Sequence, residues 1–366
     1  GRIYLVYTLL GGTVMLLGAV WFYAVAGPMD FVRGGVLREH APGRELELRV
    51  LFLTLIGGLG VKAAIFPLHG WLPRAMVAPA PVSALLHAVA VVKAGAFGIM
   101  RVVFDVYGVR LSFELGMSPV LEVAAAFTIV YGSVVALLQD DLKRRLAYST
   151  VSQLSYILLG LAMLGPLGTV GGLVHLVHQG LMKITLFFAA GNLAETLGVK
   201  RISEMDGVGR RMPLTMAAFT VAALGMIGVP PVAGFVSKWY LGLGALEQGT
   251  PWLLWVLVTS SALNSAYFLP ILYRAWFRQG PSVARRADGT TPPFDRAALE
   301  AERGAAQSRM TGTNPPRLRG VALESSWLLL LPVVVTSLLA LAVGIFANLP
   351  VSPLGLARDI VLEMYR

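Results

Sequence analysis

Nine apolar runs alternate with short polar segments along the chain. A transmembrane helix needs about 20 mostly apolar residues. The runs occupy residues 3–26, 47–69, 81–104, 118–138, 146–164, 168–196, 214–248, 252–277 and 325–348. This pattern predicts an all-α polytopic membrane protein, built as a bundle of transmembrane helices.

Prolines interrupt two of these runs. The run 47–69 ends in the segment FPLHGWLP, which contains Pro67, and the run 214–248 contains Pro230 and Pro231. Proline removes a backbone donor and breaks a helix, and such breaks occur in a bilayer only where the freed backbone faces protein or water. We therefore expect two broken helices. Their spacing, five runs apart, suggests an internal repeat.

Lysine and arginine gather in alternate loops. The loops at 139–145, 197–213 and 278–323 are basic, whereas those at 165–167 and 249–251 contain no lysine or arginine. Because basic loops stay in the cytoplasm, this alternation predicts a cytoplasmic Gly1 end and an external C-terminus. The loop 278–323 carries eight arginines and is expected to be poorly ordered at least in part, and the tail 353–366 to form a short amphipathic helix.

Composition supports a membrane protein and excludes several kinds of site. Only 14% of the 366 residues are charged, against about 25% in soluble proteins. The absence of cysteine excludes disulfides, iron–sulfur clusters and thiolate metal sites. The net charge of +10 resides in the loops, so it indicates topology rather than nucleic-acid binding. The chain starts at Gly1 and enters an apolar run almost at once, so we expect further spans before it.

Seven basic or titratable side chains fall inside the predicted spans. They are Lys62, His87, Lys93, His175, His178, Lys183 and Lys238. A charge in hydrocarbon costs roughly 2.5–3.5 kcal/mol on insertion scales, and such residues usually mark ion or proton pathways. A single one is equally well explained by snorkelling or by a structural hydrogen bond. A set spread over several spans favours a proton relay.

The segment HLVHQGLMK places three of these polar residues along one helix face. His175, Gln179 and Lys183 lie within about 80° of one another, with His178 about 60° to the other side. His87 and Lys93 are about 120° apart on a regular helix, so they share no narrow stripe. A polar stripe on an apolar helix requires a polar surrounding.

Cofactor sites are less consistent with the sequence. Haem ligation by the two histidines of this stripe would need His87 as a partner and would leave the lysines unexplained. Zinc is disfavoured without cysteine or nearby carboxylates, and no phosphate-binding loop is recognisable. We therefore expect no cofactor, no metal and no catalytic residue.

Four segments carry a family resemblance. They are VKAAIFPLHGWLPRAMVAPAPVSALLHAVAVVKAG, LKRRLAYSTVSQLSYILLG, HLVHQGLMKITLFFAAGNLAE and GVPPVAGFVSKWYL. They resemble the antiporter-like subunits, namely the large membrane subunits of respiratory complex I and the D and A subunits of multisubunit sodium/proton antiporters. The resemblance implies fourteen helices with two inverted five-helix repeats, each with one broken helix, and this chain resembles that fold from its sixth helix onward.

The same resemblance divides the chain and assigns roles in its first part. It implies the end of the first repeat at 1–104, the second repeat at 118–277 with its broken helix at 214–248, a polar cytoplasmic loop at 278–323, a last transmembrane helix at 325–348 and a tail at 353–366. Lys62 matches the lysine of the first broken helix, which in the family pairs with a glutamate two helices earlier. His87 and Lys93 match polar positions on the next helix.

In the second repeat, the resemblance implies that Lys183 is the central lysine of the connecting path, with His175 beside it. Lys238 matches the terminal residue of the second half-channel. One type of complex I subunit has glutamate there, so lysine argues against that type.

These expectations combine into a proton-translocating subunit of a multisubunit cation/proton antiporter in the bacterial inner membrane. Its expected partners are other membrane subunits, protons, sodium as a candidate second ion, and the lipid bilayer, without nucleic acid. A desolvated lysine can exchange its proton near neutral pH, whereas arginine stays protonated. Three alternatives remain open: a subunit of an NADH:quinone oxidoreductase or related membrane hydrogenase, a haem or quinone enzyme, and a structural subunit that has lost pumping.

Overall fold

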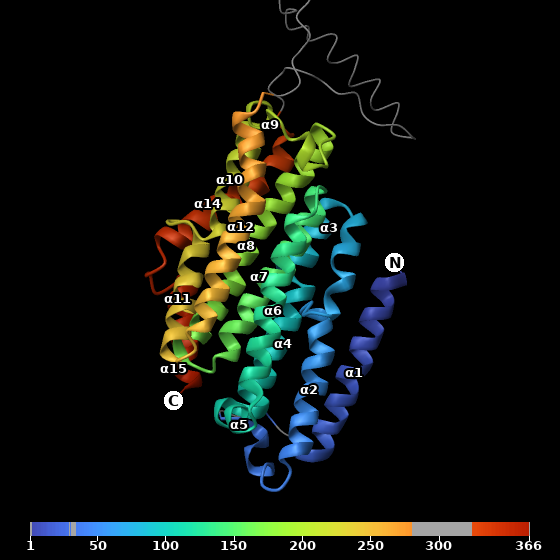
Figure 1. Cartoon of the computed structure of the whole chain (residues 1–366), viewed down its shortest axis with the longest axis vertical. Helices are drawn as coiled ribbons and strands as arrows, with labels where there is room; N and C mark the ends of the chain where they lie inside the picture. Colours follow the sequence, from blue (N-terminus) through green and yellow to red (C-terminus); the bar gives the residue numbers. More distant parts are fainter. Residues whose placement is uncertain (1, 29, 31–33, 280–323, 366) are drawn as a thin grey trace, which may run out of the picture.

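The computed structural model describes residues 2–28, 30, 34–279 and 324–365 of the chain, and these form an elongated bundle of long helices (Figure 1). Within this part the only extended pairing is an isolated bridge between Asp141 and Arg201. Six of the described helices have the length and apolar composition needed to cross a membrane. The expected all-helical membrane fold is confirmed.

The helices follow the predicted runs closely. The long ones are α1 (Arg2–Ala26), α2 (Glu45–Lys62), α6 (Met117–Leu137), α7 (Leu142–Ala162), α8 (Pro166–Thr196), α10 (Pro213–Ile227), α11 (Ala233–Glu247), α12 (Trp252–Phe277) and α14 (Trp327–Ile345). Shorter helices are α3 (Ala80–Ala84), α4 (Val91–Arg101), α5 (Gly108–Glu114), α9 (Val208–Arg211) and α15 (Pro353–Met364). Two π-helical turns, Leu85–Val89 and Val102–Tyr107, connect α3, α4 and α5 into one span of 35 residues, which bends at Ala90 and at Gly108, where φ is +75°.

Both proline-containing segments interrupt a helix. After α2 ends at Lys62, the chain passes Pro67 and continues in two 3-10 turns, Leu68–Trp71 and Pro73–Val77. Farther along, α10 ends at Gly228, which adopts the left-handed conformation with φ of +100°, and α11 resumes at Ala233. The two interruptions lie in different parts of the bundle and expose backbone groups that a continuous helix would pair internally.

The basic loops share one end of the bundle. The connections α6–α7 and α8–α10 lie at the end where α1 begins, whereas α7–α8 and α11–α12 connect at the opposite end, near α15 (Figure 1). We call the first of these the basic-loop end. The tail forms the expected helix, α15, with Leu354, Ala357 and Val361 buried on one side. The loop 278–323 lies outside the described residues except for its first two positions.

Helix α8 runs through the middle of the bundle. It packs against α7, α10, α11, α14 and the π-helical turn Leu85–Val89. Its 31 residues span about 45 Å, enough for the full thickness of a bilayer. Although Val177 is 41% exposed, most of α8 is packed against other helices, which places its polar side chains in the protein interior.

Candidate functional site

The polar side chains of α8 are completely enclosed. His175, His178, Gln179 and Lys183 all have no exposed surface. The distance from His175 to Lys183 along the helix axis is about 12 Å. The structure therefore places the four side chains as the sequence predicts, inside the protein and at successive levels across the membrane.

Lys183 is held by neutral groups of α7. Its ammonium donates hydrogen bonds to the carbonyl oxygen of Leu146, at 3.2 Å, and to the hydroxyl of Ser149. No ion pair involving this lysine occurs among the described residues. The cation is thus stabilised by dipoles rather than by a carboxylate.

The two histidines connect α8 to α11. His175 Nδ1 lies 2.8 Å from the hydroxyl of Ser237, and His178 Nδ1 donates to the carbonyl oxygen of Ala233 at 2.7 Å. Because a carbonyl only accepts, Nδ1 of His178 carries the hydrogen and its Nε2 is an acceptor. The hydroxyl of Ser237 donates its hydrogen to the carbonyl oxygen of Gly234 at 3.1 Å, so its oxygen accepts from Nδ1–H of His175.

Lys238 occupies the interruption between α10 and α11. Its ammonium donates to the carbonyl oxygens of Met226 (3.0 Å) and Ile227 (2.8 Å) and to the hydroxyl of Ser261 (2.9 Å). These carbonyls belong to the last turn of α10, where the helix dipole is negative. Gly228 leaves room for the side chain, since a Cβ there would lie 2.9 Å from Cδ of Lys238. Lys238 therefore provides hydrogen-bond donors for the backbone carbonyls that are left unpaired where the helix is interrupted.

Tyr156 of α7 links these two regions. Its ring stacks on His175 with centroids 5.2 Å apart, and the ammonium of Lys238 lies 5.3 Å from the centre of the same ring. The tyrosine is fully buried. Three helices thus bring a lysine, a histidine and an aromatic ring into one cluster.

The sequence analysis missed the polar face of α7. Ser149, Ser152, Gln153 and Tyr156 repeat at i, i+3, i+4 and i+7 and are all fully buried. Ser133 of α6 connects this face to α12, with its hydroxyl 2.9 Å from that of Ser152 and 3.3 Å from that of Ser260. The helical spacing within AYSTVSQLSYILLG was a sufficient signal to find it.

Lys93 and His87 approach α8 from the other side. A Cβ on Gly180 would lie only 2.2 Å from Nζ of Lys93, so the absence of a side chain there admits the ammonium against α8. The buried ring of His87 lies 4.8 Å from that of Phe187. Both residues therefore reach α8, although a regular helix would set them about 120° apart. His87 lies in a π-helical turn, which changes that angle.

Lys62 stands apart from this cluster. It is half-buried at the last residue of α2, and its side chain has no hydrogen bond or ion pair with the described residues. His69, which the sequence analysis did not select, is buried in the interruption beyond it, with its ring 5.0 Å from Tyr131. Pro67 lies exposed between them. The structure does not bring Lys62 into contact with the residues around α8.

Several buried polar atoms in this region lack a hydrogen-bond partner in the protein. They are both ring nitrogens of His87, both amide atoms of Gln153 and Gln179, the hydroxyl of Tyr156, and Nε2 of His175 and His178. An unsatisfied buried polar atom costs about 1–3 kcal/mol, so such atoms normally bind internal water. The arrangement is therefore suited to a hydrated polar path through the bundle.

Comparison with known proteins identifies the family. The family described as NADH:quinone oxidoreductase/Mrp antiporter, transmembrane, matches residues 1–264. This chain belongs to it. Relatives include NADH-quinone oxidoreductase subunit N of Desulforudis audaxviator (41% identity, 80% of this chain and 58% of that protein) and the A/B component of a probable K(+)/H(+) antiporter of Rhizobium meliloti (33% identity, 82% and 30%). The chain thus spans little more than half of the first relative and less than a third of the second.

Solved structures share the fold. The Mrp complex from Dietzia aligns with a TM-score of 0.77 at 24% identity, covering 100% of this chain and 68% of that one. Respiratory complex I from Thermus thermophilus gives 0.72 at 22% identity, covering 99% and 68%. The resemblance inferred from the four sequence segments is confirmed, as is the assignment to a multi-pass membrane subunit. Subunits of NADH-quinone oxidoreductases and of cation/proton antiporters both occur among the relatives, so both hypotheses from the sequence, an antiporter subunit and an oxidoreductase subunit, are consistent with the comparisons.

Proposed function

We propose that this chain carries protons across the membrane as a subunit of a multisubunit cation/proton antiporter. The observation that supports this most directly is that Lys183 and Lys238 are held by neutral acceptors, with further buried polar side chains on α7 and α8. Such a lysine can lose its proton without leaving a buried, unpaired carboxylate behind. A lysine that paired with a carboxylate would leave that anion uncompensated.

The proposed path runs along α8 from Lys183, past Gly180, where Lys93 approaches, and past His175 to Lys238 at the second interruption. His175 suits transfer because its Nε2, buried beside the ring of Tyr156, has no hydrogen-bond partner in the protein and can exchange a proton with internal water. His178 holds its Nδ1 hydrogen on the carbonyl of Ala233, so we assign it mainly to anchoring the start of α11. His87 would accept protons from water beside Phe187.

The remaining assignments extend this proposal to the rest of the chain. Lys62 would load the first half-channel at the Pro67 interruption, and Lys238 would release protons at the Pro230–Pro231 interruption. The division into a first repeat at 1–104 and a second at 118–277 fits the two interruptions. The partners would be other membrane subunits, since similar chains are described as parts of an Mrp complex and of respiratory complex I.

A second candidate is a proton-pumping subunit of an NADH:quinone oxidoreductase. The 41% identity to subunit N of such an enzyme favours it. Proton transfer through the lysines is the same in both cases, and only the source of energy differs. Proton movement driven by a sodium or potassium gradient supports the antiporter, whereas movement driven by NADH oxidation supports the oxidoreductase.

The test is proton movement in inverted vesicles that contain the assembled complex. Lys183→Met preserves side-chain length but removes the exchangeable proton, and we expect at least a tenfold loss of the rate, about 1.4 kcal/mol or more in barrier. Arg210→Gln, an exposed change at the basic-loop end, serves as control and should keep the parental rate. Assembly is checked by size-exclusion chromatography. A Lys183→Met complex that assembles and moves protons at the parental rate would contradict the proposal.

A further inference from the structure

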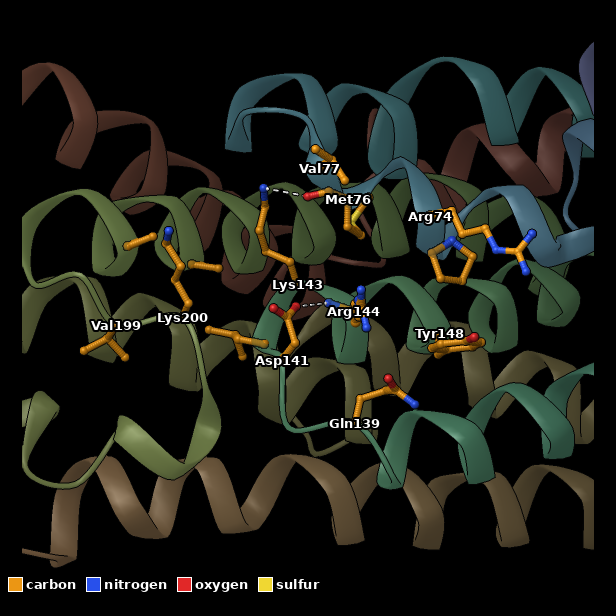
Figure 2. A pocket seen from close by; sticks show the side chains of 14 residues that line it. Arg74, Met76, Val77, Gln139, Asp141, Lys143, Arg144, Tyr148, Val199 and Lys200 are labelled. Carbon is orange, nitrogen blue, oxygen red and sulfur yellow. Dashed lines mark hydrogen bonds between the residues drawn. The ribbon is translucent and has the colours of Figure 1, made fainter. Parts of the chain in front are cut away.

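A pocket of about 700 Å³ lies at the basic-loop end, outside the buried polar cluster. Its walls come from the 3-10 turn Pro73–Val77, the start of α7, the last turns of α8 and the strand-like segment around Lys200, which are distant in sequence (Figure 2). The proposed proton path uses none of the side chains that line it. The pocket therefore requires its own explanation.

Cations dominate this pocket. Four basic side chains line it, spread along its length in Figure 2: Arg74, Lys143, Arg144 and Lys200. Asp141 is the one carboxylate among the lining residues, and its Oδ1 accepts the backbone N–H of Arg144 at 2.8 Å as the cap of α7. The pocket consequently has a clear excess of positive charge.

Only one of the four cations is already bound by the protein. Lys143 donates to the carbonyl oxygens of Met76 (3.3 Å) and Ala78 (2.6 Å), which fixes the 3-10 turn to α7. The side chains of Arg74, Arg144 and Lys200 make no hydrogen bond or ion pair with the described residues. Three cationic side chains without a protein partner thus line the same recess, with Arg144 between Arg74 and Lys200.

The surroundings of the pocket indicate which anion would bind. Val77, which lines the pocket, is 95% exposed, and Leu138, next to the lining residue Gln139, is 75% exposed. Below Leu138, α6 continues to present apolar side chains outward, including Val134 and Phe127. The cations therefore lie where a polar helix end meets an apolar outer surface, the level at which phospholipid headgroups reside.

We propose that this pocket binds the phosphate of an anionic phospholipid. Arg144, between the other two, contacts the phosphate, for which the planar guanidinium is well suited. Arg74 and Lys200, toward the two ends of the pocket, attract the anionic headgroup, and the acyl chains lie along Val77, Leu138 and the outer face of α6. The ligand joins the first interrupted helix to α7 and α8. A soluble phosphate would satisfy the cations but would leave the apolar rim without a partner.

The experiment measures lipid-dependent thermal stability of the purified membrane protein in detergent. Dioleoyl phosphatidylglycerol, dioleoyl phosphatidylcholine and inorganic phosphate are titrated separately. We expect phosphatidylglycerol alone to raise the melting temperature of the parent. Each basic residue near a membrane surface changes the affinity for anionic lipid about fivefold. The double variant Arg74→Gln/Lys200→Gln should therefore weaken the apparent affinity roughly 30-fold. Both residues are exposed, so folding should be preserved.

Arg210→Gln serves as the matched control, because Arg210 is an exposed cation at the same end but does not line the pocket. It should retain the parental response to phosphatidylglycerol. Native mass spectrometry should find retained phosphatidylglycerol on the parent and on Arg210→Gln but not on the double variant. An unchanged response in the double variant would overturn the site. A response to inorganic phosphate equal to that to phosphatidylglycerol, or to phosphatidylcholine alike, would overturn the assignment to an anionic lipid.

Discussion

Replacing Lys238 separates two roles that the structure combines in one side chain. The ammonium caps α10 by donating to the carbonyls of Met226 and Ile227, and in our proposal it also exchanges a proton. Methionine at this position has a similar length but no donor. Arginine retains donors and charge, but it does not release its proton at physiological pH. The two variants should therefore fail in different ways.

The expected loss of stability follows from the hydrogen bonds. In Lys238→Met, Met226 keeps one partner, because the side-chain amide of Asn264 also donates to its carbonyl at 3.1 Å. The carbonyl of Ile227 loses its partner, which costs about 1–3 kcal/mol. Loss of a cation at a helix C-terminus adds about 0.3–1 kcal/mol. We expect a destabilisation of about 1–4 kcal/mol for methionine and less than about 1 kcal/mol for arginine.

Two measurements distinguish the roles. Thermal denaturation of the purified complex reports stability, and dye-monitored acidification of vesicles reports proton movement. Lys238→Arg should be near parental in the first measurement and at least about tenfold slower in the second, because its proton is retained. Full proton movement by Lys238→Arg would refute proton exchange at this residue. A Lys238→Met protein as stable as the parent would refute the capping argument.

Two further predictions concern α8 and the topology. Gly180→Ala should displace the ammonium of Lys93 from α8 and slow proton movement several-fold. The control is Gly57→Ala, which gains the same roughly 0.5–1 kcal/mol of helix propensity but has open space around the new methyl group, so it should keep the parental rate. Equal rates in the two variants would show that the position of Lys93 is unimportant. Single cysteines at Thr250 and Gln279, which flank α12, should react with a membrane-impermeant maleimide from opposite sides of the membrane, and labelling from one side would contradict the membrane crossing of α12.

The sequence was sufficient for the elements that depend on hydropathy. The runs at 168–196 and 252–277 appear almost unchanged as α8 and α12, because a bilayer fixes both the length and the apolar composition of a helix. The burial of His175 and Lys183 could also be predicted from the apolar residues around them in the sequence. An ionisable side chain inside such a run usually faces the protein interior, because contact with lipid is costly.

The hydrogen-bond partners of the buried cations could not be predicted from the sequence. Lys183 and Lys238 are bound by carbonyls of Leu146, Met226 and Ile227, and a backbone carbonyl is present at every position of any sequence. Side-chain types in a sequence reveal candidate carboxylate partners, but they give no sign of which carbonyl a lysine will reach. The contact of Lys93 with α8 depends on Gly180, a residue whose contribution is the absence of a side chain. Tertiary packing alone reveals such contributions.

The neutral partners explain how two buried lysines can coexist with reversible proton transfer. All ion pairs of the described residues involve arginine, and none includes Lys183 or Lys238. A carboxylate would hold the proton of a neighbouring lysine strongly, and its own charge would remain buried once that proton left. A carbonyl or hydroxyl stabilises the ammonium through its dipole and tolerates the neutral amine equally well. In an intact helix the backbone carbonyls are paired internally, whereas the end of a broken helix leaves carbonyls free. The interruption at Pro230 and Pro231 therefore creates the binding site for Lys238, and in the proposed mechanism it also keeps the proton of Lys238 exchangeable.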